Sequence, residues 1–238
     1  MFDVNSLIAM LLTIPGVFLA LSVHECAHGW VSYKLGDPTA KNLGRLTLNP
    51  LKHIDIMGFV CMVLFHFGWA KAVPVNARYY KKPRRDMALV AAAGPISNVL
   101  MGFIGIFLLY LSYYLYSVIA KEPYAIYEIL YFPELGIQAR SVKLMYLLIL
   151  FLQQFAILNV SLAVFNLLPV PPLDGSRIAY IFLPSRIYFG IMRYERYIMI
   201  GMFVLLWLGA FSGVLSTVSG FLLDGMESIV RLIPIFRF

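Results

Sequence analysis

The chain has 238 residues, of which 61% are hydrophobic and 13% are charged, whereas an ordinary soluble domain has about 45 to 50% and about 25%. This composition, with a mean hydropathy of +0.81, excludes a typical cytosolic protein and indicates a polytopic membrane protein. The formal net charge of +7 could suggest nucleic-acid binding, but in so apolar a chain lysines and arginines more readily set membrane topology. We therefore expect a lipid bilayer as the environment and no nucleic-acid partner.

Hydrophobic runs long enough to cross a bilayer divide the chain. In chain order they lie near residues 5–33, 87–120, 144–168 and 197–223. Lysine and arginine number ten over residues 34–85, three over 121–143, four over 177–196 and two at the C-terminal end. By the positive-inside rule the two richer segments face the cytoplasm and the N-terminus lies outside. The absence of a targeting segment suits a bacterial cell membrane.

Residues 38–83 do not fit a simple series of spans. Glycines and prolines there separate short apolar, β-branched and aromatic stretches, a pattern typical of strands and turns. We expect a small β hairpin or re-entrant strand segment near the cytoplasmic side, where protein or water satisfies its backbone. The predicted fold class is an α-helical polytopic membrane protein with about four to six transmembrane helices, forming one integral-membrane domain over residues 1–238.

The first run contains the sequence His-Glu-Cys-Ala-His at residues 24–28. Because residues four apart project from one helix face, His24 and His28 could bind one zinc ion, with Glu25 beside a metal-bound water. Glu25 is the sole charged side chain in residues 4–33, and an ionisable group at membrane depth costs at least about 2.5 kcal/mol unless it is paired or solvated. The alternative is a hydrogen-bond network that only holds helices together.

A catalytic zinc site has three protein ligands and one open position, so a third ligand must come from elsewhere. Candidates are His53, His66 and Asp174. Asp174 is the only charged residue between Lys143 and Arg177, and it follows a proline-rich sequence that should end the third span. Its spacing is equally compatible with a metal ligand and with a solvated Asp-Gly turn.

Four motifs together resemble the site-2 protease family of intramembrane zinc metalloproteases, in its short bacterial form without PDZ or CBS domains. They are H-E-C-A-H at 24–28, G-R-L-T-L-N-P at 44–50, A-G-P-I-S-N at 93–98 and F-N-L-L-P-V-P-P-L-D-G at 165–175. The resemblance covers roughly residues 15–180. It implies one zinc ion per chain, held by His24, His28 and Asp174, with Glu25 as the general base and Asn98 near the site.

The resemblance implies hydrolysis of peptide bonds within or near transmembrane segments, with a transmembrane protein or peptide as substrate. We expect Asn98 and Asn166 to contact that substrate. Asn166 shares a helix face with Asn159, seven residues earlier, although asparagines in spans also serve as contacts between helices. The alternative function is a non-proteolytic metal-binding membrane protein, either a transporter or a pseudoenzyme. Glu25 favours the protease, because a site that only binds metal needs no base beside its ligands.

Overall fold

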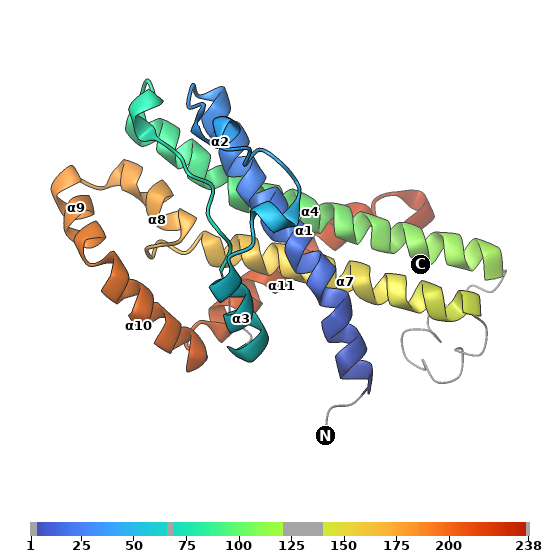
Figure 1. Cartoon of the computed structure of the whole chain (residues 1–238). Coiled ribbons are helices and arrows are strands. Elements are labelled where there is room, and N and C mark those ends of the chain that lie inside the picture. The colour runs from blue at the N-terminus through green and yellow to red at the C-terminus, as the bar shows by residue number, and fades with distance from the viewer. Residues whose placement is uncertain (1–3, 66–68, 121–139, 237–238) are drawn as a thin grey trace. The chain divides into compact units, whose positions relative to one another are not determined.

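The computed structural model describes residues 4–65, 69–120 and 140–236, and these residues are mostly helical (Figure 1). The longer helices are α1 (Val4–Lys34), α3 (Ile56–Phe65), α4 (Pro83–Ala120), α7 (Arg140–Asn166), α9 (Ser185–Arg193), α10 (Glu195–Trp207) and α11 (Ser212–Val230). Shorter elements are α2 (Thr39–Asn42), α8 (Asp174–Ala179), η1 (Pro50–Lys52), η2 (Ala77–Tyr79), η3 (Tyr180–Phe182) and η4 (Pro234–Phe236). The predicted helical class is confirmed.

Three of the described helices have the length and hydropathy of membrane-crossing segments. They cover Pro83–Val118, Leu144–Asn166 and Ser212–Val230. The first two correspond to the predicted runs 87–120 and 144–168. Helix α1, with 31 residues, is also long enough to cross a hydrocarbon core of about 30 Å. Its crossing, the total of about four to six spans and the orientation stay predictions.

The run 197–223 is not one continuous helix, and that prediction is wrong. Helix α10 ends at Trp207 and α11 begins at Ser212. Between them Gly209 has a φ of +74°, the left-handed conformation that commonly ends a helix. With 13 residues, α10 is too short to cross a bilayer alone. Hydropathy detects the apolar run but not the break between the two helices within it.

The predicted β hairpin is also wrong for the described part of residues 38–83. Residues 56–65, expected to be strand, form helix α3. The only β pairing there is an isolated antiparallel bridge between Ile54 and Ala70. Valine and phenylalanine favour strands only where a sheet surface receives them, so their abundance misled the prediction. Residues 66–68 of this stretch lie outside the described residues.

The chain groups into two compact units. Unit 1 comprises Met1–Val17, Leu100–Val160 and Ser219–Phe238, and unit 2 comprises Phe18–Val99 and Ser161–Val218. Helices α1, α4, α7 and α11 each contribute residues to both units. The prediction of one domain over residues 1–238 stays a prediction.

In unit 1, α4 and α7 run side by side and approach closely at small residues (Figure 1). A Cβ atom at Gly102 would lie 2.7 Å from Cγ2 of Val160, and one at Gly105 would lie 3.2 Å from Cβ of Ala156. Small residues at helix contacts are typical of membrane proteins, in which close backbone approach replaces hydrophobic burial as the source of attraction.

A polar cluster in unit 1 connects α4 with α11. The hydroxyl of Tyr110 donates to Oε1 of Glu227, and Nε of Arg231 donates to the Tyr110 hydroxyl at 2.7 Å. Nη2 of Arg231 also contacts Oε1 of Glu227 at 2.9 Å. The three side chains therefore satisfy one another's hydrogen bonds.

In unit 2, Asp37 organises the chain that follows α1. Its fully buried carboxylate accepts hydrogen bonds from the Ser32 hydroxyl, from the backbone and hydroxyl of Thr39, and from the backbone N–H of Asn76. Burial alone would raise the pKa of Asp37, but these hydrogen bonds outweigh it and hold the pKa below its ordinary value. The same carboxylate thus joins the end of α1 to a segment about forty residues later.

Candidate metal centre

Helix α1 presents two histidines on one face. His24 and His28 are one helical turn apart, and both residues are buried, with 5% and 9% exposure. Their Nε2 atoms are 3.0 Å from each other. The predicted i, i+4 geometry is therefore present in the structure.

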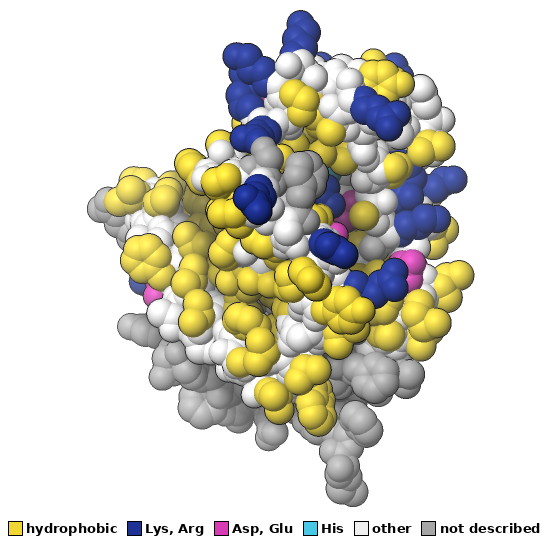
Figure 2. Space-filling model, turned by 90° about the vertical axis from the view of Figure 1, so that its left-hand side faces the viewer, with side chains coloured by type: hydrophobic (Ala, Val, Ile, Leu, Met, Phe, Trp, Pro, Cys, Tyr) yellow, Lys and Arg dark blue, Asp and Glu magenta, His cyan; other side chains and the backbone are white. Residues whose placement is uncertain are grey.

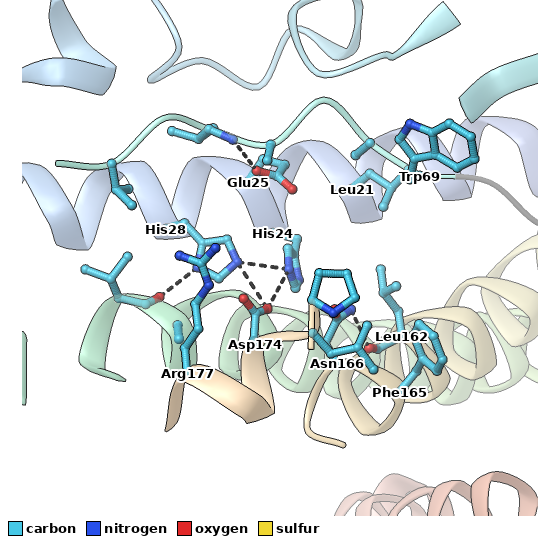
Figure 3. A pocket seen from close by; sticks show the side chains of 18 of the residues that line it. Leu21, His24, Glu25, His28, Trp69, Leu162, Phe165, Asn166, Asp174 and Arg177 are labelled. Carbon is cyan, nitrogen blue, oxygen red and sulfur yellow. Dashed lines mark hydrogen bonds and ion pairs between the residues drawn. The ribbon is translucent and has the colours of Figure 1, made fainter. Parts of the chain in front are cut away.

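Asp174 meets these histidines from another part of unit 2 (Figure 3). Helix α7 ends at Asn166 and α8 begins at Asp174, as expected from the three prolines between them. Oδ2 of Asp174 lies 3.1 Å from Nε2 of His24 and 3.3 Å from Nε2 of His28. Asp174 therefore faces the histidines and does not occupy a solvated turn.

Gly175 explains how Asp174 reaches this position. A Cβ atom at Gly175 would lie 2.2 Å from the carbonyl oxygen of Leu167 and 2.5 Å from that of Leu168. The start of α8 therefore packs directly against the backbone at the end of α7. Only glycine permits this approach, because both opposing atoms belong to the main chain.

The Nδ1 atom of each imidazole is hydrogen-bonded to a residue of α4. Nδ1 of His28 donates to the carbonyl oxygen of Val90 at 2.7 Å, because a carbonyl can only accept. Nδ1 of His24 lies 2.5 Å from Oδ1 of Asn98, whose Nδ2 donates to the carbonyl oxygen of Ala20. These contacts place the proton of each neutral imidazole on Nδ1, so both Nε2 atoms present lone pairs.

The close approach of α4 to the histidines occurs at Gly94. A Cβ atom there would lie 2.4 Å from Nε2 of His28 and 2.6 Å from both Cε1 and Nε2 of His24. No real side chain fits at these distances, so the glycine of the A-G-P-I-S-N motif leaves the space that the two rings occupy.

The three converging atoms have the arrangement that a small cation requires. Two imidazole lone pairs and one carboxylate oxygen are separated by 3.0, 3.1 and 3.3 Å. Ligands at about 2.1 Å from a tetrahedral zinc ion are separated by about 3.4 Å. Oδ2 of Asp174 has no hydrogen-bond partner among the described residues. The residues present therefore fit zinc.

Glu25 belongs to the same pocket, although it is not part of the converging trio. Its Oε2 accepts a hydrogen bond from the backbone N–H of Val73 at 2.7 Å. The segment that carries Val73 is itself held by Arg45, whose Nη2 donates to the carbonyl oxygens of Lys71 and Ala72 at 2.6 and 3.3 Å. One carboxylate oxygen of Glu25 is thus fixed by the backbone.

These side chains line a cavity of about 560 Å³ within unit 2. Its wall is otherwise largely apolar and includes Leu21, Trp69, Val73, Leu162, Phe165 and Met202. Figure 2 shows acidic side-chain atoms in a hollow that is surrounded by hydrophobic and basic side chains. A cavity of this size, with a largely apolar wall and a few convergent polar groups, has the character of a ligand-binding site.

The remaining predicted site residues occupy different positions. Asn98 is fully buried against His24 and does not line the cavity, whereas Asn166 does line it. Nδ2 of Asn166 donates to the carbonyl oxygen of Leu162 at 2.9 Å. His53 is bonded to the carbonyl oxygen of Thr47 and lies outside the group that converges with Asp174. His66 lies outside the described residues.

Sequence reasoning missed several residues that shape the site. Arg45 and Gly94 belong to motifs quoted for the resemblance, but the motifs alone assign them no contact. Val73 and Val90 act through backbone atoms, so their residue type does not reveal their role. Arg177 is separated from Asp174 by only two residues, and that spacing on a helix is the one signal that could have identified it.

Comparisons with known proteins identify the family of the chain. The sequence matches the model of Peptidase family M50 over residues 12–209. It is 43% identical over 162 residues to "Putative zinc metalloprotease YwhC" of Bacillus subtilis (strain 168), covering 68% of this chain and 64% of that protein. It is 30% identical over 97 residues to "Putative zinc metalloprotease Rip2" of Mycolicibacterium smegmatis (strain ATCC 700084 / mc(2)155), covering 38% and 37%.

Each alignment spans less than two thirds of the relative's own length. No solved structure matches the chain. The family match nevertheless covers most of the sequence, including both the histidine pair and Asp174. The chain therefore belongs to Peptidase family M50, the site-2 protease family.

Proposed function

We propose that this protein is an intramembrane zinc metalloprotease that hydrolyses peptide bonds within or near transmembrane segments of other membrane proteins. The convergence of His24, His28 and Asp174 beside Glu25 carries the proposal. Two histidines, one carboxylate and a neighbouring glutamate are the residue types of hydrolytic zinc sites. Family membership supports the same activity.

His24, His28 and Asp174 would hold one zinc ion per chain through Nε2, Nε2 and Oδ2. The 3.0 to 3.3 Å separations support this assignment, because they match the edges of a zinc tetrahedron. Three protein ligands leave the fourth position open for water or substrate. Bound zinc would acidify its water and polarise the substrate carbonyl.

Glu25 would act as the general base. It accepts a proton from the attacking water and later passes that proton to the leaving amine. The hydrogen bond from Val73 N–H to Oε2 supports this role, since it fixes one carboxylate oxygen and leaves the other to handle the proton. Arg45 contributes by holding the segment that carries Val73.

Asn98 and Val90 would orient the metal ligands. Their bonds to the Nδ1 atoms of His24 and His28 fix the ring directions and raise the basicity of the Nε2 atoms. This role fits the burial of Asn98 better than the predicted contact with substrate. Asn166 lines the cavity and remains our candidate for contact with the substrate backbone.

A membrane location follows from the apolar helices, and the substrate is a membrane-embedded protein or peptide. We propose a bacterial cell membrane, with the N-terminus outside and the catalytic centre toward the cytoplasm. The excess of lysine and arginine over residues 34–85 supports this orientation. We propose further that residues 1–238 act as one integral-membrane domain.

Metal content and cleavage together test the function. Detergent-purified wild type should retain zinc, measured by inductively coupled plasma mass spectrometry, while His24→Ala and Asp174→Ala should lose it. Glu25→Gln should retain zinc but lose cleavage of a synthetic transmembrane peptide. Full zinc retention in Asp174→Ala would refute the ligand set. Undiminished cleavage by Glu25→Gln would refute the base, and zinc retention without any cleavage by wild type would favour a non-proteolytic protein.

A further inference from the structure

The cavity contains one cationic side chain to which the proposed function gives no role. Among the described lining residues, Arg177 is the only lysine or arginine. It lies three residues after Asp174 on α8, so the two side chains project from adjacent parts of the helix surface. Figure 3 shows both side chains extending from α8 toward α1 and its histidines.

Among the described residues, Arg177 makes one hydrogen bond, and its acceptor is not an oxygen atom. Its recorded hydrogen bond joins Nη1 to Sδ of Met87 at 3.8 Å, and a thioether is a weak acceptor. No carboxylate of the described chain lies within 4.0 Å of it. Arg45, in contrast, donates to two backbone carbonyl oxygens. A planar group with five donors therefore lines the cavity, and among the described residues only one of these donors has a partner.

We propose that Arg177 donates hydrogen bonds to a main-chain carbonyl oxygen of the peptide substrate beside the metal centre, an inference that rests on the proposed function. Carbonyl oxygens of a substrate helix are occupied by backbone hydrogen bonds until the helix unwinds. An unwound segment in this largely apolar cavity then needs donors from the protein, because an unsatisfied carbonyl at membrane depth is costly. Arg177 supplies such donors next to the reacting bond.

The membrane setting favours a carbonyl over an acidic side chain as the acceptor. Acidic side chains are rare within transmembrane segments, whereas every residue of an unwound segment offers a carbonyl oxygen. A carbonyl carries no full charge in the ground state. If the acceptor is the carbonyl under attack, its oxygen becomes more negative in the transition state, so the hydrogen bond strengthens as the reaction proceeds.

The first test compares Arg177→Gln and Arg177→Lys with Arg186→Gln, which removes an exposed arginine that does not line the cavity. All three should retain the zinc content of wild type. Arg177→Gln should lower kcat/KM for a synthetic transmembrane peptide by roughly tenfold to a hundredfold, with a smaller loss in Arg177→Lys. Arg186→Gln should match wild type. Equal activity of Arg177→Gln and wild type would overturn the inference.

The second test separates contact with a carbonyl from a structural effect. It uses two peptidyl hydroxamates that differ at one peptide bond, whose carbonyl oxygen is replaced in the second compound by sulfur, a weaker hydrogen-bond acceptor. Wild type should bind the carbonyl compound at least about tenfold more tightly, and Arg177→Gln should lose most of this preference. An unchanged preference in Arg177→Gln, with each carbonyl position tested in turn, would overturn the inference.

The two proposals fail in distinguishable ways. If wild type cleaves and Glu25→Gln does not, while Arg177→Gln behaves as wild type in both tests, only the role of Arg177 is refuted. If wild type shows no zinc-dependent cleavage beyond that of Glu25→Gln, the proposed function fails and the role of Arg177 fails with it.

Discussion

Replacing Gly94 by alanine should destroy the proposed metal centre without replacing any of its proposed ligands. The added Cβ would lie 2.4 Å from Nε2 of His28 and 2.6 Å from two ring atoms of His24, whereas ordinary contact distances begin at 3.4 Å. The rings or α4 must therefore move by about 1 Å. Two rotatable side chains move more readily than a 38-residue helix that packs closely against α7. Because metal–ligand distances tolerate deviations of only about 0.2 Å, we expect at least one histidine to leave the coordination sphere.

The loss of zinc affinity should exceed the loss caused by mutating a residue that only orients a ligand. Mutation of a residue that orients a metal ligand typically costs about tenfold to a hundredfold in metal affinity. Displacement of a ligand should cost more, so we expect Gly94→Ala to bind zinc more than a hundredfold more weakly than wild type. Competition with a chromophoric chelator measures the affinity, and residual cleavage of a transmembrane peptide measures the consequence.

Gly102→Ala is the matched control, because it adds the same atom to the same helix. Its Cβ would lie 2.7 Å from Cγ2 of Val160, so it also strains a helix contact, but one in unit 1. We expect a lower melting temperature and unchanged zinc affinity. Wild-type zinc affinity in Gly94→Ala would refute the reasoning, since the histidines could not then be the ligands in the positions described.

Three further variants test the surroundings of the site. Arg45→Gln removes the hydrogen bonds to the segment that positions Glu25, so kcat should fall about tenfold while zinc content is unchanged. Asp37→Asn should lower the free energy of unfolding by about 2 kcal/mol. The pKa of Asp37 is lowered in the folded state. Its contribution to the free energy of unfolding is therefore complete above the ordinary pKa of about 4 and is lost as the pH falls further. Urea unfolding at several pH values should show this loss in wild type and not in the variant. Tyr110→Phe leaves Glu227 without its hydroxyl donor and should destabilise the protein by about 1.5 kcal/mol, measured as a lower melting temperature in detergent.

The convergence of His24, His28 and Asp174 was largely predictable, because it depends on the geometry of one helix and on recognisable sequence motifs. His24 and His28 meet through the helical repeat alone. Asp174 was ambiguous on spacing, and family resemblance selected it over a turn aspartate. The structure now gives a physical reason, because Gly175 brings α8 against the carbonyl oxygens of Leu167 and Leu168 and so directs the carboxylate toward the histidines.

The remaining features could not be predicted, because residue types do not encode them. Val73 and Val90 contribute an N–H and a carbonyl oxygen, which every non-proline residue carries. The stretch 56–65 satisfies helix and strand patterns alike, since its residues are apolar throughout and only the surrounding packing decides. The interruption at Gly209 lies within a continuous apolar run, so hydropathy could not distinguish two helices from one.

Glycines, which lack a side chain, are as important to this candidate metal centre as the proposed ligands. On α1 itself, a Cβ atom at Gly29 would lie 2.7 Å from Leu46 and 3.1 Å from Val73. At Gly94 and Gly175 the neighbouring atoms lie closer still. Each glycine lets a different segment reach the ligand-bearing helix or the start of α8. A sequence that kept His24, Glu25, His28 and Asp174 but carried alanine at position 94 would satisfy the ligand pattern and still lack the space for it. The glycines are therefore part of what specifies the site, because the ligands converge only where the backbones can approach.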